Sequence, residues 1–248
     1  MSDWLKKLFS ILFPKDIKCI CCEAELQKSS RFCMCENCLN NLPFIGEHFC
    51  KKCGEKLSSL SNVCLSCKDH SERYFTFNRS VFCYEGVIKK LIFDLKYNNA
   101  KWLGEYLGRF LVDEYLKMGI KADYIIPIPL NKNRLKQRGY NQSEVISKPF
   151  ETELGIKLET QNFIRTIDTP TQTNLTKKER ETNLLGAFEV LNKDIFKNKT
   201  ILLVDDVFTT GSTMEEASKT LLKAKAKAVY TLTLAHTQRP IITEGKDK

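Results

Sequence analysis

Cysteine placement is the strongest constraint on how this chain folds. Ten of its eleven cysteines lie between residues 19 and 67, and eight of them form four pairs that each have two residues between the thiols. One tight turn with this spacing presents two sulfurs to one ion, and tetrahedral Zn²⁺ needs two such turns. We therefore predict two zinc ribbons in series, Cys19/Cys22/Cys35/Cys38 and Cys50/Cys53/Cys64/Cys67.

The predicted zinc sites are structural rather than catalytic. A closed shell of four sulfurs leaves no coordination position for a substrate, and a short region with few large apolar side chains needs metal to fold. Disulfide bonding is the alternative. Cys21 and Cys33 are additional thiols that could each replace a neighbour, and the pairs could interleave instead of following the sequence order.

The sequence offers no transmembrane segment. No apolar run approaches the roughly 18–20 residues that cross a bilayer. Residues 1–14 are amphipathic, and we expect a short helix that packs on its own protein, with a membrane-surface helix as the alternative. No small-residue cleavage site follows them, so we expect a cytoplasmic protein, in a reducing compartment where dense cysteines favour metal over disulfides.

The region after the cysteines has a different pattern, which predicts a second domain. We place the boundary so that residues 1–72 hold the amphipathic segment and the zinc ribbons, and residues 73–248 form the second domain. Short apolar stretches alternate there with segments of helical periodicity, which indicates a parallel sheet covered by helices. The expected strands are 80–84, 124–129, 199–205 and 229–235, and the expected helices are 87–97, 101–118, 141–154 and 214–225.

Residues 201–213 form the most informative segment of this second domain. An apolar strand leads to two adjacent carboxylates, Asp205 and Asp206, and then to Val207, Phe208, Thr209, Thr210, Gly211, Ser212 and Thr213 before a helix begins. Hydroxyl groups, a glycine and a helix N-terminus together suit one phosphate group. The carboxylates could hold ribose hydroxyls, directly or through Mg²⁺. An ordinary capped helix would explain Ser212 or Thr213 but not the whole segment.

These residues resemble the phosphoribosyl pyrophosphate (PRPP) signature of type I phosphoribosyltransferases. The chain as a whole resembles the ComF family, in which a double zinc ribbon is fused to a phosphoribosyltransferase domain. The cysteine pairs, residues 95–97, 127–129 and 138–142, and several positions from Arg165 to Phe188 carry the likeness. It implies an α/β fold with a parallel sheet flanked by helices.

The resemblance also implies roles for individual residues. Asp205 and Asp206 would bind the ribose hydroxyls and assist Mg²⁺, and residues 209–213 would hold the 5-phosphate. The basic residues Lys132, Arg134 and Arg138 would help to bind the pyrophosphate. A lid is expected within residues 166–180. We expect Arg138 and Asn141 to be the more important for the site, because the loop around them has no evident packing purpose in the sequence.

The chemistry implied by the resemblance is displacement at ribose C1, in which a nitrogen nucleophile replaces pyrophosphate. The acceptor is unknown. Enzymes that act on hypoxanthine or guanine carry an acidic residue where this chain has Thr209, which weakens that interpretation.

A second hypothesis is that PRPP only regulates a protein that handles single-stranded DNA, because ComF relatives are associated with natural transformation. The net charge of +9 and the basic stretch 132–138 are compatible with phosphate contacts, and the ribbons could bind DNA or a helicase of the DNA-uptake apparatus.

Overall fold

The computed structural model describes residues 17–27, 30–58, 61–69, 73–167 and 185–238. The amphipathic segment expected over residues 1–14 and nearly all of the expected lid lie outside this part of the chain. Contacts divide the chain into two compact units, residues 1–42 and 43–248, which we describe separately. The domain boundary placed after residue 72 stays a prediction.

The first unit is a small, irregular structure organised by cysteines. The amide of Cys19 donates to the carbonyl of Ala24 across a tight turn in which Glu23 has a positive φ. The short helix α2 (Glu36–Asn40) begins directly after Cys35, whose sulfur accepts from the amide of Cys38. The amide of Cys35 donates to the sulfur of Cys19 at 3.4 Å, which joins the two cysteine pairs.

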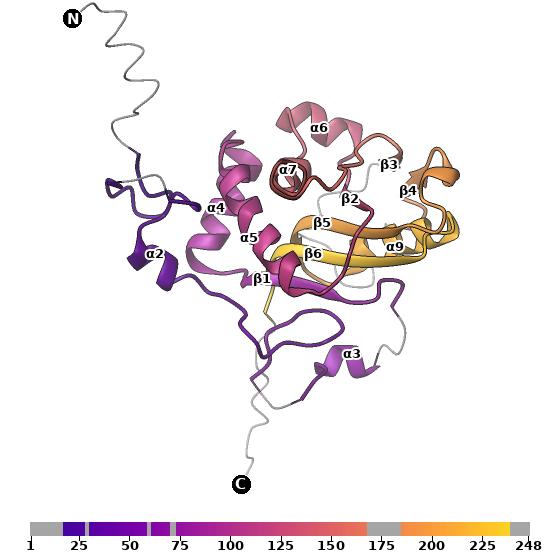
Figure 1. Cartoon of the computed structure of the whole chain (residues 1–248), viewed down its shortest axis with the longest axis horizontal. Coiled ribbons are helices and arrows are strands. Elements are labelled where there is room, and N and C mark those ends of the chain that lie inside the picture. Colours follow the sequence, from indigo (N-terminus) through magenta and orange to yellow (C-terminus); the bar gives the residue numbers. More distant parts are fainter. Residues whose placement is uncertain (1–16, 28–29, 59–60, 70–72, 168–184, 239–248) are drawn as a thin grey trace, which may run out of the picture. The chain divides into compact units, whose positions relative to one another are not determined.

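The second unit is built around a parallel sheet (Figure 1). Within the described residues this sheet has the order β1-β6-β5-β2, and each neighbouring pair is parallel. Most residues of each strand are buried, because helices cover both faces of a parallel sheet. The strands are β1 (Asn78–Cys83), β2 (Tyr124–Pro127), β5 (Thr200–Phe208) and β6 (Ala228–His236).

Helices cover both faces of this sheet. α5 (Leu103–Lys117) and α7 (Gln142–Leu154) pack closely together on one face, since a Cβ at Gly108 would lie 2.3 Å from the carbonyl oxygen of Ile146. α9 (Ser212–Lys223) covers the other face, where its Ala217 and Leu221 share one apolar cluster with alternate residues of β5. The parallel sheet with flanking helices confirms the predicted fold class.

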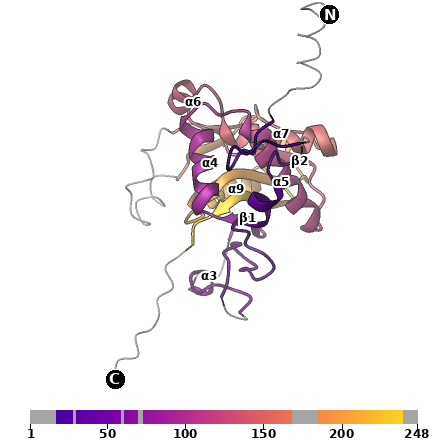
Figure 2. The same cartoon turned by 90° about the vertical axis from the view of Figure 1, so that its left-hand side faces the viewer.

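Smaller elements complete the second unit. Helix α4 (Gly86–Tyr97) follows β1, and an antiparallel pair lies outside the main sheet. Figures 1 and 2 show α6 and α3 on opposite sides of the main sheet. These elements are α3 (Leu65–Asp69), α6 (Lys132–Arg138), β3 (Phe163–Arg165), β4 (Phe188–Val190) and the 3₁₀ turn η2 (Lys193–Ile195).

Three features differ from the sequence-based expectation. Strand β5 does not end at Asp205 but continues to Phe208, because it stays paired with β6 as far as His236. Residues 132–138 form a helix, capped by Asn131 at its start and by Gly139 with a positive φ at its end. The antiparallel strands β3 and β4 were not predicted. No helix in the described part of the chain is long and apolar enough to cross a membrane.

Candidate functional site

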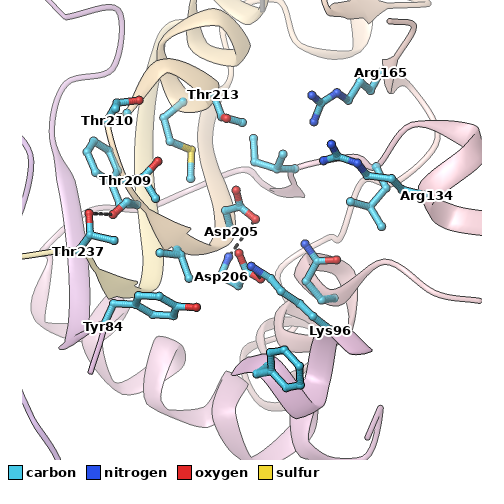
Figure 3. A pocket seen from close by; sticks show the side chains of 18 of the residues that line it. Tyr84, Lys96, Arg134, Arg165, Asp205, Asp206, Thr209, Thr210, Thr213 and Thr237 are labelled. Atoms are coloured by element: carbon cyan, nitrogen blue, oxygen red, sulfur yellow. Dashed lines mark hydrogen bonds and ion pairs between the residues drawn. The ribbon is translucent and has the colours of Figure 1, made fainter. Parts of the chain in front are cut away.

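A cavity of about 920 Å³ opens at the carboxyl edge of the parallel sheet (Figure 3). Residues at or just beyond the ends of the four strands contribute to its wall: Tyr84, Ile128, Phe208 and Thr237. Ligands of open α/β sheets bind at this edge, because loops and helix N-termini converge there. The cavity is therefore the candidate ligand site.

Asp205 and Asp206 lie near the end of β5 and line the cavity. The hydroxyl of Ser143 donates to Asp205 Oδ1 at 2.7 Å, and the backbone amide of Asp206 donates to the same oxygen at 2.9 Å. Burial and the neighbouring Asp206 charge raise the pKa of Asp205 to about 7, although Ser143 and Lys96 oppose the change. Asp205 is thus poised to gain or lose a proton near neutral pH.

Lys96 supplies the positive charge beside these carboxylates. It projects from the last turn of α4, and its Nζ lies 2.6 Å from Asp206 Oδ2 (Figure 3). Burial opposes the ammonium charge, but Asp206 and Asp205 outweigh it and raise the pKa of Lys96. Lys96 therefore stays charged, and the ion pair compensates for the burial of Asp206, which is only 3% exposed.

The segment after β5 forms a cradle at one side of the cavity. Thr209, Thr210, Gly211 and Thr213 line it, while the Ser212 hydroxyl lies 2.8 Å from that of Thr210. Gly211 has a φ of 85°, and a Cβ on it would lie 2.5 Å from the ring of Phe208. Both the backbone conformation and the lack of space therefore require glycine at this position. It has no side chain to cap the first amides of α9, and the amide of Ser212 donates only a long hydrogen bond, of 3.4 Å, to Thr210 Oγ1. Such a helix N-terminus suits an anion.

Basic side chains line the other side of the cavity. Arg134 and Arg165 point toward the carboxylates in Figure 3, and Arg138 also contributes to the wall. The Arg138 guanidinium lies 5.4 Å from the centre of the Tyr97 ring and donates to Gln142. Lys132 is exposed and is not among the lining residues. The cavity thus combines a carboxylate pair with anion-binding groups on two sides.

The loop around Asn141 has a packing role, contrary to the expectation from the sequence. Asn141 accepts from the amide of Ser143 as the N-cap of α7, and its Nδ2 donates to the carbonyl of Ile128 at 3.0 Å. The buried hydroxyl of Tyr140 donates to the carbonyl of Leu95. These bonds connect α7, β2 and α4, so Asn141 positions the wall of the cavity and does not itself line it.

Four residues of the site have no role predicted from the sequence: Tyr84, Lys96, Ser143 and Arg165. Lys96 left a signal, because it lies four residues after Ile92 and eight after Ile88, in line with buried apolar positions of α4. A lysine at such a position needs a partner. Ser143 has no such signal in the sequence, because its role depends on a hydrogen bond to Asp205, 62 positions away.

Two groups of four cysteines occur among the described residues, Cys19/Cys22/Cys35/Cys38 and Cys50/Cys53/Cys64/Cys67. Within each group the sulfurs all lie within 4.8 Å of one another. Sulfurs on one tetrahedral Zn²⁺ are separated by about 3.8 Å, as the Zn–S length requires. Distances of 3.8 Å for Cys22–Cys35 and 3.6 Å for Cys53–Cys64 match this geometry. The cysteines fit zinc, and they are grouped in sequence order.

The thiols of the second group are close enough to influence one another's protonation. Hydrogen bonds from the Cys53 and Cys67 thiols lower the pKa of Cys50, while the hydrogen bonds of Cys53 with Cys50 and Cys67 raise the pKa of Cys53. Four thiolates in so small a space need a cation to balance their charge. Cys21 and Cys33 lie outside both groups, and the sulfur of Cys33 donates to the carbonyl of Lys18.

The second cysteine group is connected to the cradle. Arg73 lies between them: its Nη1 donates to Glu215 of α9 at 2.8 Å, and its Nη2 lies 3.9 Å from the sulfur of Cys67. Glu215 also accepts from the amide of Tyr74. Ser66, one residue before Cys67, lines the cavity. The second group therefore supports the helix whose N-terminus forms the cradle.

Comparison with known proteins agrees with this architecture. The chain is 30% identical to Competence protein F of Haemophilus influenzae over 230 residues, which cover 89% of this chain and 97% of that protein. The chain belongs to the ComF family. Family models match a double zinc ribbon domain at residues 8–68 and a phosphoribosyl transferase domain at residues 149–248. The predicted family, the zinc ribbons and the phosphoribosyltransferase domain are thereby confirmed.

Other ComF relatives are similar over most of the chain. DNA utilization protein YhgH of Salmonella typhimurium is 30% identical over 76% of this chain and 84% of its own. Competence protein ComFC of Bacillus subtilis is 27% identical over 81% of this chain and 83% of its own.

Proposed function

We propose that the cavity binds PRPP together with Mg²⁺ and that the protein is a phosphoribosyltransferase with an acceptor still to be identified. One observation carries the proposal: the carboxylates of Asp205 and Asp206 share a cavity with the cradle and with Arg134 and Arg165. A sugar phosphate needs acceptors for its hydroxyls and donors for its phosphates, and this arrangement offers both.

The assignment of groups follows from the placement of donors and acceptors. Asp205 and Asp206 accept from the ribose hydroxyls, while residues 209–213 and the first amides of α9 hold the 5-phosphate. Arg134, Arg138 and Arg165 bind the pyrophosphate. The oxygen donors of the carboxylates also suit Mg²⁺, which typically uses one or two carboxylates and completes its shell with water and substrate phosphates.

The reaction is a displacement at ribose C1. The bond to pyrophosphate breaks, a bond to the acceptor forms, and the acceptor gives up a proton. Mg²⁺ supplies positive charge for the leaving pyrophosphate. The arginines stabilise the same charge by hydrogen bonds. Asp205, whose pKa is about 7, is suited to bind ribose hydroxyls as a carboxylate at slightly alkaline pH.

Calorimetry with PRPP and Mg²⁺ tests this proposal. We expect binding by the wild-type chain and a loss of at least about tenfold in affinity on Asp206→Asn, since a charged hydrogen-bond partner contributes about 1.5–3 kcal/mol. Asp113→Asn, on the distant helix α5, is the control and should bind normally. Unchanged affinity on Asp206→Asn would overturn the assignment of the site.

Helix α6 favours a second candidate function, the handling of single-stranded DNA. In this function PRPP would be a regulatory ligand and not a substrate. Lys132 and Lys136 are exposed on this helix, next to two arginines that line the cavity. This basic surface suits a phosphate backbone. The names of the relatives, which refer to competence and DNA utilization, are compatible with a role in DNA uptake.

Release of pyrophosphate separates the two functions. If the protein is an enzyme, at least one member of a panel of nucleobases and amines added with PRPP should cause release of pyrophosphate. No release with any member favours PRPP as a regulatory ligand. Single-strand binding through α6 should weaken steeply with salt and on the double change Lys132→Gln, Lys136→Gln. Binding that is independent of salt would exclude this basic surface as the DNA site.

A further inference from the structure

Lys96 is placed to do more than neutralise a buried charge. Its side chain is 20% exposed and lines the cavity, although its helix is anchored by the fully buried neighbours Leu95 and Ile92. The backbone of Lys96 is therefore fixed, whereas its four-carbon stem has rotatable bonds and borders the cavity. Movement of this one side chain needs no rearrangement of the fold.

Asp206 depends on this lysine. Lys96 Nζ lies 2.6 Å from Asp206 Oδ2, and within the described residues no other group donates a hydrogen bond to this buried oxygen. The groups that face the ammonium are Asp206, Asp205 and the hydroxyl of Tyr84. One carboxylate oxygen of the pair that lines the cavity is thus occupied by a lysine.

We infer that Lys96 is a ligand-exchange residue, which neutralises Asp206 in the ligand-free site and donates to the phosphates of the incoming sugar phosphate when Asp206 binds the ligand. This inference rests on the proposed function. Lys96 then couples the binding of the two ligands. It disfavours a cation that binds alone and favours the same cation when an anion binds with it.

The coupling follows from electrostatics. An ammonium and a divalent cation on the same carboxylate oxygen would lie only about 4 Å apart, where like charges repel strongly in a partly buried site. A bare cation must therefore displace Lys96 without compensation. A phosphorylated ligand instead provides a new partner for the displaced ammonium, so that metal and anion assist each other's binding.

The test measures the two ligands separately. Mn²⁺ alone, followed by electron paramagnetic resonance, reports on the bare cation, and calorimetry with PRPP at saturating Mg²⁺ reports on the anion. For Lys96→Met we expect bare Mn²⁺ to bind severalfold more tightly and PRPP to bind about tenfold more weakly, because a charge-assisted hydrogen bond is lost. Lys90→Met, an exposed lysine of the same helix, should change neither affinity.

Opposite signs distinguish exchange from simple support of the fold. A general loosening of the site would weaken both ligands, and that result, or two unchanged affinities, would overturn the inference. Lys96→Gln, which keeps a donor for Asp206 without the charge, covers the case in which Lys96→Met does not fold, and it should show the same signs. Failure of the wild-type chain to bind PRPP would instead refute the proposed function. The Mn²⁺ comparison would still decide whether Lys96 hinders the binding of a cation to Asp206.

Discussion

The two four-cysteine groups have the same spacing in each pair but different surroundings. In the first group Cys22 is exposed, and Cys35 and Cys38 are partly exposed. In the second group all four cysteines are at most 7% exposed, and they share an apolar cluster with Phe75 and with residues of α9 and the parallel sheet.

The same cysteine motif therefore has a different structural role in each unit. The first group organises a small unit by local bonds and borders on solvent. The second is part of the core of the α/β unit, where Arg73 connects it to the helix that begins at the cradle. Metal in the second group should therefore affect the stability of the candidate site, and metal in the first should affect mainly its own unit.

The largest expected effect comes from removing the last ligand of each group. Cys67→Ser should lower the free energy of unfolding of the α/β unit by at least about 3 kcal/mol, because bound Zn²⁺ contributes directly to folding. Cys38→Ser, at the matching position of the first group, should leave that unit's unfolding nearly unchanged. Chemical denaturation followed by circular dichroism measures both. Equal losses would abolish the distinction between the groups.

A smaller effect is expected from the connection between the second group and the cradle. Arg73→Met removes a partly buried ion pair with Glu215 and should destabilise the α/β unit by about 1–3 kcal/mol. It should also weaken PRPP binding severalfold, because α9 loses an anchor close to its N-terminus. Lys117→Met removes a more exposed ion pair and serves as the control. If PRPP binds normally to Arg73→Met, the second group supports the fold but not the site.

The smallest expected effect is a pH dependence of stability that belongs to the second unit. Because burial raises the pKa of Asp205 from 3.8 to about 7, its contribution to stability is fully present below pH 4 and is lost as the pH rises through 7. Asp205→Asn should remove this decline and be the more stable protein at pH 8. Urea unfolding at pH 5 and pH 8 provides the comparison. The same decline in both proteins would assign it to another group.

The sequence predicted those parts of the structure that depend on neighbouring residues. Cysteine spacing gave the two metal groups, and the apolar strand followed by hydroxyl-rich residues gave the cradle. Helix α6 was missed because its residues, Lys132 to Arg138, have no apolar periodicity. The three-residue strands β3 and β4 are too short to leave a pattern, and their pairing across a long intervening segment is a tertiary effect.

The missing parts of the site have the same explanation. Lys96, Ser143 and Arg165 come from α4, α7 and β3, and only the packing of these elements brings them to the cavity that holds Asp205. Asn141 is the opposite case. Its place in a polar loop suggested ligand binding, but in the structure it caps α7 and donates a hydrogen bond to the carbonyl of Ile128 at the end of β2. Tertiary contacts decide both cases.

A crystal structure with ribose 5-phosphate and Mg²⁺ is the most direct test of the central assignment. The phosphate should accept hydrogen bonds from the amides of residues 210–213, with the ribose hydroxyls at Asp205 and Asp206. A phosphate bound elsewhere, with the segment after β5 empty at saturating ligand, would contradict the assignment.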